Sequence, residues 1–109
     1  MQVSLRTNNA DLSEALRVYV ERRLRFTLAR FGPRVGQVTV RVEADGPNET
    51  ICRISTEILP FGRVAVEERD PDLFAAIDRG TGRVGRLFAR ELARARDWRA
   101  SRDSIRTAA

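Results

Sequence analysis

The residues best suited to chemistry in this sequence are arginines near its C-terminal end. On an ideal helix with about 100° per residue, five of them share an arc of about 80°: Arg79, Arg83, Arg86, Arg90 and Arg94. None of the five has an acid at i±4, where a solubilising helix face would place ion-pair partners, and only Glu91 falls near the arc. Guanidinium groups bind phosphates in bidentate geometry. This arginine stripe therefore predicts contact with a nucleic acid, and a solvated helix face is the alternative.

The charge of the whole chain is distributed in blocks. Its 109 residues include 20 basic and 15 acidic residues, and every basic residue is Arg. Residues 17–34 have a net charge of +5 and residues 79–109 one of +6, whereas residues 35–78 have a net charge of −5. This separation favours a polyanionic partner more strongly than the total of +5 does.

The composition offers little for catalysis. The chain has no His, the commonest general base, and its one Cys, Cys52, lies at an inward position of a predicted strand. The acidic pairs Glu67-Glu68 and Asp70/Asp72 lie at a strand end and a helix start, where structural roles explain them. We therefore expect no enzyme, no cofactor, no metal and no small-molecule substrate. No apolar run approaches the ~18 residues of a membrane span, and no signal peptide is apparent, so we expect a cytoplasmic monomer without membrane contact.

The elements that position the stripe follow from the apolar periodicity. Alternation of polar and apolar residues predicts strands over residues 2–6, 38–43 and 50–59, and a fourth marked by Val64 and Val66. Between the first and the second of these strands, one apolar stripe at spacings of three and four predicts a helix of roughly twenty residues.

Capping residues predict where the two helices begin and end. The apolar stripe of the first helix runs from Leu12 to Phe31, and Gly32-Pro33 ends it. Asp70 and Pro71 predict the cap and the first position of the second helix, which extends to the mid-nineties.

The resulting order, β-α-β-β-β-α, predicts an α+β fold. We expect a two-layer sandwich in which both helices cover one face of a four-stranded mixed sheet, with the first two strands parallel and hairpins joining the rest. Residues 1–98 form the domain, and residues 99–109 are predicted to be a flexible C-terminal tail. Because both helices share a face, we expect their outer surfaces to form one continuous basic groove.

Two smaller sets of residues complete these expectations. Most Phe residues occupy predicted core positions, and for Trp98 packing on the last helical turn is favoured over stacking on a base. The stacking aromatics of single-strand binders are thus largely missing, which favours double-stranded RNA as the ligand. Among the glycines of the second helix, Gly80 is predicted to permit close approach of the first helix, and Gly82 has no explanation.

Several segments carry a resemblance to a known family. The first is the strand Met1-Gln2-Val3, followed by Asn8-Asn9 and the helical run over residues 12–20. The most specific is Asp72-Leu73-Phe74-Ala75-Ala76-Ile77-Asp78, which precedes basic positions 83, 86 and 90. Over about residues 1–96 the chain resembles the ribosome hibernation-promoting factor family, also known as ribosome-associated inhibitor A or protein Y, in its short form.

The resemblance implies the same fold and a function in translation. Members of this family bind the small ribosomal subunit and its ribosomal RNA in the channel for messenger and transfer RNA, and silence idle ribosomes in stationary phase and under stress. By motif position Arg83, Arg86 and Arg90 carry over as RNA-binding residues, and Arg23 matches a basic position of the first helix. Arg79 and Arg94 are predicted to bind RNA as well, from the helical geometry alone. The family has larger residues at Gly80, Gly82 and Gly85, and its long members have a further C-terminal domain.

Two other functions remain open from the sequence. One is a general structured-RNA-binding module without ribosome specificity, and the other is an adaptor whose basic face docks an acidic protein. All three are non-enzymatic, and they differ in what the arginine stripe contacts.

Overall fold

The computed structural model describes the backbone of residues 1–8 and 13–108 and the side chains of residues 1–8 and 14–98. Its strands are β1 (Gln2–Thr7), β2 (Val35–Ala44), β3 (Thr50–Ile58) and β4 (Arg63–Asp70). Its helices are α1 (Ser13–Leu28), the short 3-10 helix η2 (Ala29–Arg34) and α2 (Leu73–Ala108). The predicted α+β order is confirmed, with η2 as an addition.

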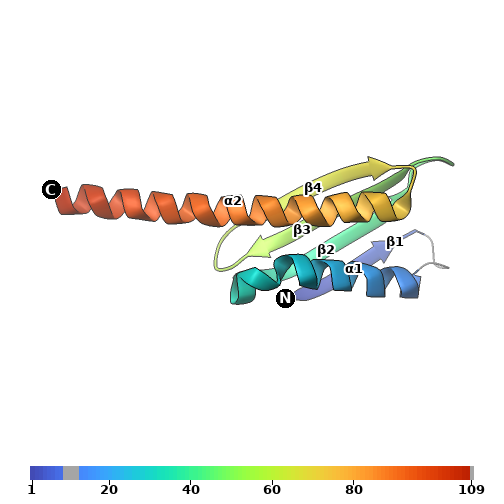
Figure 1. Ribbon diagram of the computed structural model, residues 1–109, viewed down its shortest axis with the longest axis horizontal. Helices are drawn as coiled ribbons and strands as arrows, with labels where there is room; N and C mark the ends of the chain where they lie inside the picture. Colours follow the sequence, from blue (N-terminus) through green and yellow to red (C-terminus); the bar gives the residue numbers. More distant parts are fainter. Residues whose placement is uncertain (9–12, 109) are drawn as a thin grey trace.

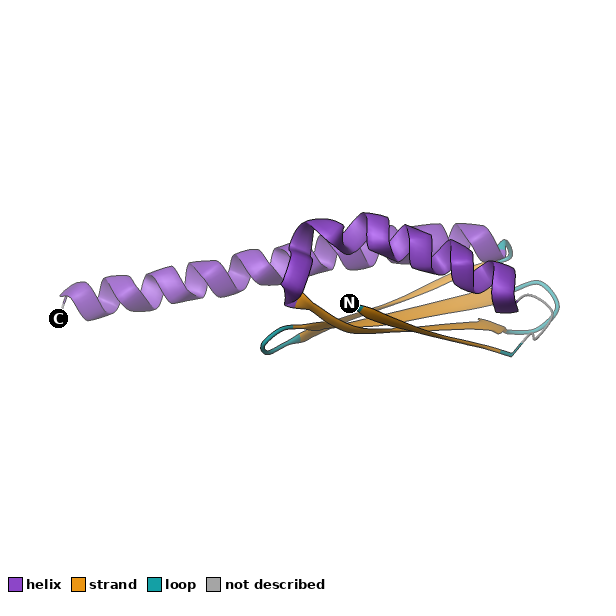
Figure 2. Ribbon diagram, turned by 90° about the horizontal axis from the view of Figure 1, so that it is seen from below, coloured by secondary structure: helices purple, strands orange, loops and turns teal. Residues whose placement is uncertain are grey.

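The four strands form one mixed sheet in the order β1-β2-β3-β4 (Figure 1). β1 runs parallel to β2, with Gln2 opposite Gln37, and the other two pairs are antiparallel. Both helices cover the same face of the sheet, and the opposite face is left open, as Figure 2 shows. The predicted crossover, hairpins and two-layer arrangement are therefore confirmed.

The core lies between the inward face of the sheet and the two helices. Alternate residues of β2 and β3, such as Val38, Val40 and Ile54, are almost fully buried. From α2, the residues that fill it are Ile77, Val84 and Phe88, which have no exposed surface. α1 supplies a row at i, i+4 spacing: Leu16, Val20, Leu24 and Leu28. The predicted phase of both helices is correct in this region, while Leu12 lies outside the described residues.

The first helix ends earlier than its apolar pattern predicts. The α-helix stops at Leu28, and the chain continues as η2 through Gly32, which has φ 53°, and Pro33. A positive φ at Gly32 breaks the helical path, and the chain then enters β2 at Val35. Phe31 is half-buried and stacks on Phe88 with ring centroids 4.5 Å apart, so its core position is kept although it is not in the α-helix.

The second helix differs from its prediction at both ends. Asp70 is the last residue of β4, and Asp72 is the cap, since its Oδ1 accepts the Phe74 N–H at 2.9 Å. The predicted end in the mid-nineties is wrong, because α2 extends to Ala108 through a segment that has neither Gly nor Pro. This half of α2 projects past the end of the sheet (Figure 1), which leaves Ala95 exposed. Flexibility of residues 99–109 stays a prediction.

The glycines of α2 have different surroundings. A Cβ at Gly85 would lie 2.5 Å from Thr27 Cγ2, so this glycine, and not Gly80, permits the close approach of α1. Gly80 instead faces the sheet, where Ile54 Cδ1 would lie 3.1 Å from an added Cβ. Gly82 would meet only the end of the Arg86 side chain at 3.4 Å, so packing does not require a glycine there.

Candidate nucleic-acid interface

The arginine stripe lies on the side of α2 that faces β4 and solvent, away from α1. Arg79 and Arg83 contact residues of β4, whereas Asp78 and Gly85 contact α1. The arginines of the stripe therefore do not border the groove between the two helices. The continuous basic groove expected from the sequence is divided, because Asp78 and aromatic rings lie between the two helices.

The first two arginines of the stripe are held by acids of β4. Arg79 Nη2 donates to Asp70 Oδ2 and to the Arg69 carbonyl, each at 2.8 Å. Arg83 Nη1 lies 3.2 Å from Glu68 Oε1, a carboxylate that is 21% exposed. The expectation that only Glu91 lies near the stripe is therefore wrong for these two, which we name the paired arginines. Their partners are distant in sequence and adjacent only through the packing of α2 on β4.

The next two arginines differ sharply from the paired ones. Arg86 and Arg90 are exposed, and within the part of the chain that the structure describes neither takes part in an ion pair. We name them the open arginines. Arg94, one turn further, lies 3.3 Å from Glu91 Oε1, but this pair is exposed and contributes little. The stripe therefore presents its available positive charge between residues 86 and 94.

Arg23 of α1 belongs to a separate contact between the helices. Its Nε lies 3.2 Å from Asp78 Oδ1, an ion pair in which the N–H does not point at the oxygen. The Tyr19 hydroxyl donates to the same oxygen at 2.5 Å, and this hydrogen bond raises the pKa of Tyr19. The Tyr19 ring also meets Phe74 edge-on, with centroids 4.9 Å apart. Sequence reasoning located Arg23 but not Asp78, whose position on the α1 side of α2 a helical wheel would show.

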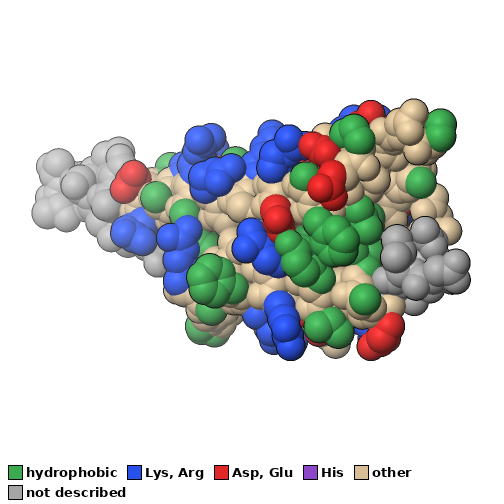
Figure 3. Space-filling view, turned by 45° about the vertical axis from the view of Figure 1, so that its right-hand side comes forward, with side chains coloured by type: hydrophobic (Ala, Val, Ile, Leu, Met, Phe, Trp, Pro, Cys, Tyr) green, Lys and Arg blue, Asp and Glu red, His purple; other side chains and the backbone are tan. Residues whose placement is uncertain are grey.

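Arginine side chains gather over the helices in the face that Figure 3 shows, with acidic side chains beside some of them and an apolar patch between. The exposed apolar side chains include three of the five Phe residues: Phe26, Phe61 and Phe74. Phe26 is 83% and Phe61 90% exposed, so the expectation that most Phe residues occupy core positions is not met. Trp98, expected to pack, is 61% exposed.

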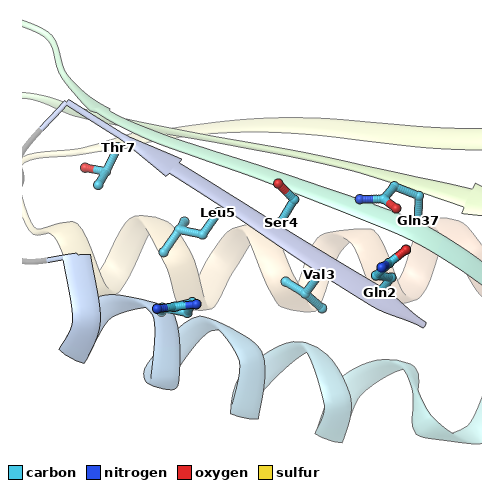
Figure 4. A pocket seen from close by; sticks show the side chains of 7 residues that line it. Gln2, Val3, Ser4, Leu5, Thr7 and Gln37 are labelled. Atoms are coloured by element: carbon cyan, nitrogen blue, oxygen red, sulfur yellow. The ribbon is translucent and has the colours of Figure 1, made fainter.

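A hollow along the free edge of β1 offers no acid–base chemistry. It is lined by amide, hydroxyl and aliphatic side chains and by Arg17 of α1, and Figure 4 shows Val3 and Leu5 on its α1 side. Arg17 is paired with Glu14 at 2.8 Å. Cys52 is buried in the core, and burial raises the pKa of its thiol to about 12. Neither feature places a reactive group at a surface.

Two further findings concern only the described residues. Among them no three His, Cys, Asp or Glu side chains form a group that would hold a metal ion. No described helix combines the length and the apolar character needed to cross a membrane.

Comparison with known proteins gives a family match over most of the chain. The family described as Sigma 54 modulation protein / S30EA ribosomal protein matches residues 3–96, from β1 through the arginine stripe. No match was found among curated proteins.

Solved structures share the fold. The crystal structure of the Thermus thermophilus Protein Y N-terminal domain is 32% identical with a TM-score of 0.71, and the alignment covers 83% of this chain and 98% of that one. A ribosomal subunit interface protein from Coxiella burnetii has the same TM-score at 16% identity, over 85% of this chain and 99% of that one, and supports the fold alone. These matches agree with the resemblance found from the sequence: the chain belongs to the sigma 54 modulation protein / S30EA ribosomal protein family.

Proposed function

We propose that this protein is a ribosome-associated hibernation factor that inhibits translation by occupying the small subunit. In this proposal the stripe on α2 contacts phosphates of ribosomal RNA, and the bound domain blocks the channel for messenger and transfer RNA. The protein acts in the cytoplasm as a monomer, during stationary phase or stress, and requires no chemical step. The description of the matching family, which names an S30EA ribosomal protein, supports a ribosomal partner.

The observation that carries the proposal is the pair of open arginines. Arg86 and Arg90 stand one turn apart on an exposed helix face, and no described acid neutralises either. Two like charges at i, i+4 cost helix stability, and a bound phosphate removes that cost. Each guanidinium also offers five donors in a planar fork that matches phosphate oxygens. Arg83, a paired arginine, and Arg94 extend the same row toward either end.

The experiment compares binding of small subunits by the wild-type protein and by a triple variant, Arg83→Ala, Arg86→Ala and Arg90→Ala. Each lost phosphate contact removes about 0.7–0.9 from the slope of log affinity against log salt. We expect weaker binding, a slope flatter by about 1.5–2 that comes mainly from the two open arginines, and a matching loss of inhibition in cell-free translation. A double variant of the open sheet face, Arg41→Ala and Arg53→Ala, is the control, because it removes arginines far from α2.

Sedimentation separates this function from the alternatives. In a sucrose gradient of a stationary-phase lysate, a hibernation factor migrates with small subunits and whole ribosomes. A general RNA-binding module would spread across the gradient, and an adaptor for an acidic protein would remain near the top. The proposal is wrong if the folded triple variant binds and inhibits as the wild-type protein does.

A further inference from the structure

A second exposed feature lies where α2 leaves the end of the sheet. A pocket of about 410 Å³ opens there, between the β3–β4 turn, the end of η2 and the last described turns of α2. The turn contributes Phe61 and α2 contributes Trp98, which are 90% and 61% exposed. Its volume falls within the range of small-ligand sites. Two large aromatic rings thus stand at the mouth of a hollow.

The turn that carries Phe61 is fixed in place by hydrogen bonds. The Ile58 N–H donates to the Gly62 carbonyl at 2.9 Å and closes the turn. Arg34, at the end of η2, accepts the Leu59 N–H on its carbonyl and donates its Nε to the Leu59 carbonyl. These hydrogen bonds fix the backbone from which the Phe61 side chain projects, and this lowers the entropy cost of stacking another ring upon it.

The pocket is also flanked by positive charge. Arg34 and Arg94 both line it, and Arg94 follows the open arginines Arg86 and Arg90 at steps of four residues along α2. Residues at this spacing share one helix face. A phosphate backbone that follows the open arginines along α2 therefore arrives at Arg94, next to the aromatic rings.

We propose that this aromatic pocket binds an unstacked base of single-stranded RNA, whose neighbouring phosphates lie on Arg90 and Arg94. The inference rests on the proposed function, since it assigns to the ribosome-binding face a site for an unpaired nucleotide. Single-stranded RNA is recognised by stacking on aromatic rings, which accept any base, together with arginines along the backbone. An apolar protein segment is a poorer fit, because seating it would remove Arg34, Arg94 and Glu91 from water.

The single Trp of the chain makes the site directly observable. Stacking of a base on or beside Trp98 quenches its fluorescence, so titration with an eight-residue oligouridine reports occupation of the pocket. An abasic ribose-phosphate oligomer of the same length is the second probe, because it has the same charge and no rings. We expect the oligouridine to quench Trp98 and to bind about tenfold more tightly than the abasic oligomer.

The test variant is Phe61→Ala, which removes an exposed ring and no core contact. We expect it to weaken oligouridine binding about tenfold, leave binding of the abasic oligomer unchanged, and retain the wild-type melting temperature. Phe26→Ala is the matched control, since Phe26 is similarly exposed but does not line the pocket. It should change neither affinity.

The outcomes distinguish this site from the function as a whole. Equal affinity for the two probes, or an unchanged oligouridine affinity in Phe61→Ala, overturns the pocket but leaves small-subunit binding by the open arginines intact. An equal effect of Phe26→Ala and Phe61→Ala also overturns it, because exposed rings in general would then be responsible. If the triple arginine variant still binds small subunits, the proposed function fails instead.

Discussion

The paired and the open arginines are two halves of one stripe, and their surroundings differ although their spacing does not. Arg79 and Arg83 pair with Asp70 and Glu68 of β4, while no described acid pairs with Arg86 or Arg90, and the first four residues of β4 include no acid. The difference shows that a row of like charges on a helix is not uniform in what it offers a ligand. The availability of each arginine depends on whether the neighbouring strand places an acid beside it.

A phosphate that binds the stripe must displace different groups at the open and at the paired arginines. At the open arginines an incoming phosphate replaces only water, so the full charge-assisted contact is gained. At the paired arginines it must compete with carboxylates that already occupy the donors. The exposed ion pairs themselves contribute only about 0–1 kcal/mol, but the uncompensated acids left behind repel the same phosphate. Function is therefore expected to concentrate on the open half.

The largest expected effect comes from removing the two halves separately. Arg86→Ala with Arg90→Ala should weaken small-subunit binding about 100-fold, at roughly 1.5 kcal/mol for each charge-assisted contact. Arg79→Ala with Arg83→Ala removes the same formal charge but should weaken binding only about threefold. Filter binding at several salt concentrations measures both, and the slope should flatten mainly in the first variant. Equal losses in the two variants would abolish the distinction between the halves.

A smaller effect should follow from releasing a paired arginine. Glu68→Gln keeps the size of the side chain and removes the charge that holds Arg83. It also removes a longer pair with Arg79, at 3.8 Å, but leaves Asp70 on that arginine. We expect binding about threefold tighter and a salt slope steeper by up to about 0.9. Glu43→Gln, which frees Arg41 on the open sheet face, makes the same change of charge and is the control. If both variants gain equally, total charge is responsible and not the position of Arg83.

The smallest effect on binding is expected at the glycines within the stripe. Gly82→Ala adds a methyl group that meets only the flexible end of Arg86, and should stabilise the fold by about 0.5–1 kcal/mol with affinity unchanged. Gly85→Ala should instead destabilise it by about 1–3 kcal/mol, because its Cβ would lie 2.5 Å from Thr27. Thermal unfolding followed by circular dichroism measures both. A change in affinity in Gly82→Ala would mean that the added methyl group shifts the Arg86 side chain or that the helix bends there on binding.

Much of the fold could be predicted because its signals are local. Alternation along β2 and β3 and the spacing of Leu16, Val20 and Leu24 each arise from one face of one element. The residues at which the helices end were harder to predict. The apolar pattern continues to Phe31 although the α-helix stops at Leu28, since η2 keeps that ring on the core by a different backbone path.

For the candidate site, only the features set by the geometry of a single helix could be predicted. The common face of Arg83, Arg86 and Arg90 follows from helical geometry alone. Their availability to a ligand does not, because Glu68 pairs with Arg83 across the packing of α2 on β4, a contact between residues 15 apart in the chain. The contact between Arg23 and Asp78 was missed for the same reason, as the two residues lie on different helices.

The parallel pairing of β1 with β2 has a consequence for the order in which the chain assembles. β3 and β4 join their neighbours through short turns, which close at little entropic cost, whereas Gln2 meets Gln37 only after the intervening α1 and η2 have been laid down. During synthesis β1 leaves the ribosome before β2, so it has no strand to pair with until β2 has been made. Docking of β1 therefore closes the longest loop within the sheet, and we expect this edge strand to be released before the β2–β3 and β3–β4 hairpins when the domain opens.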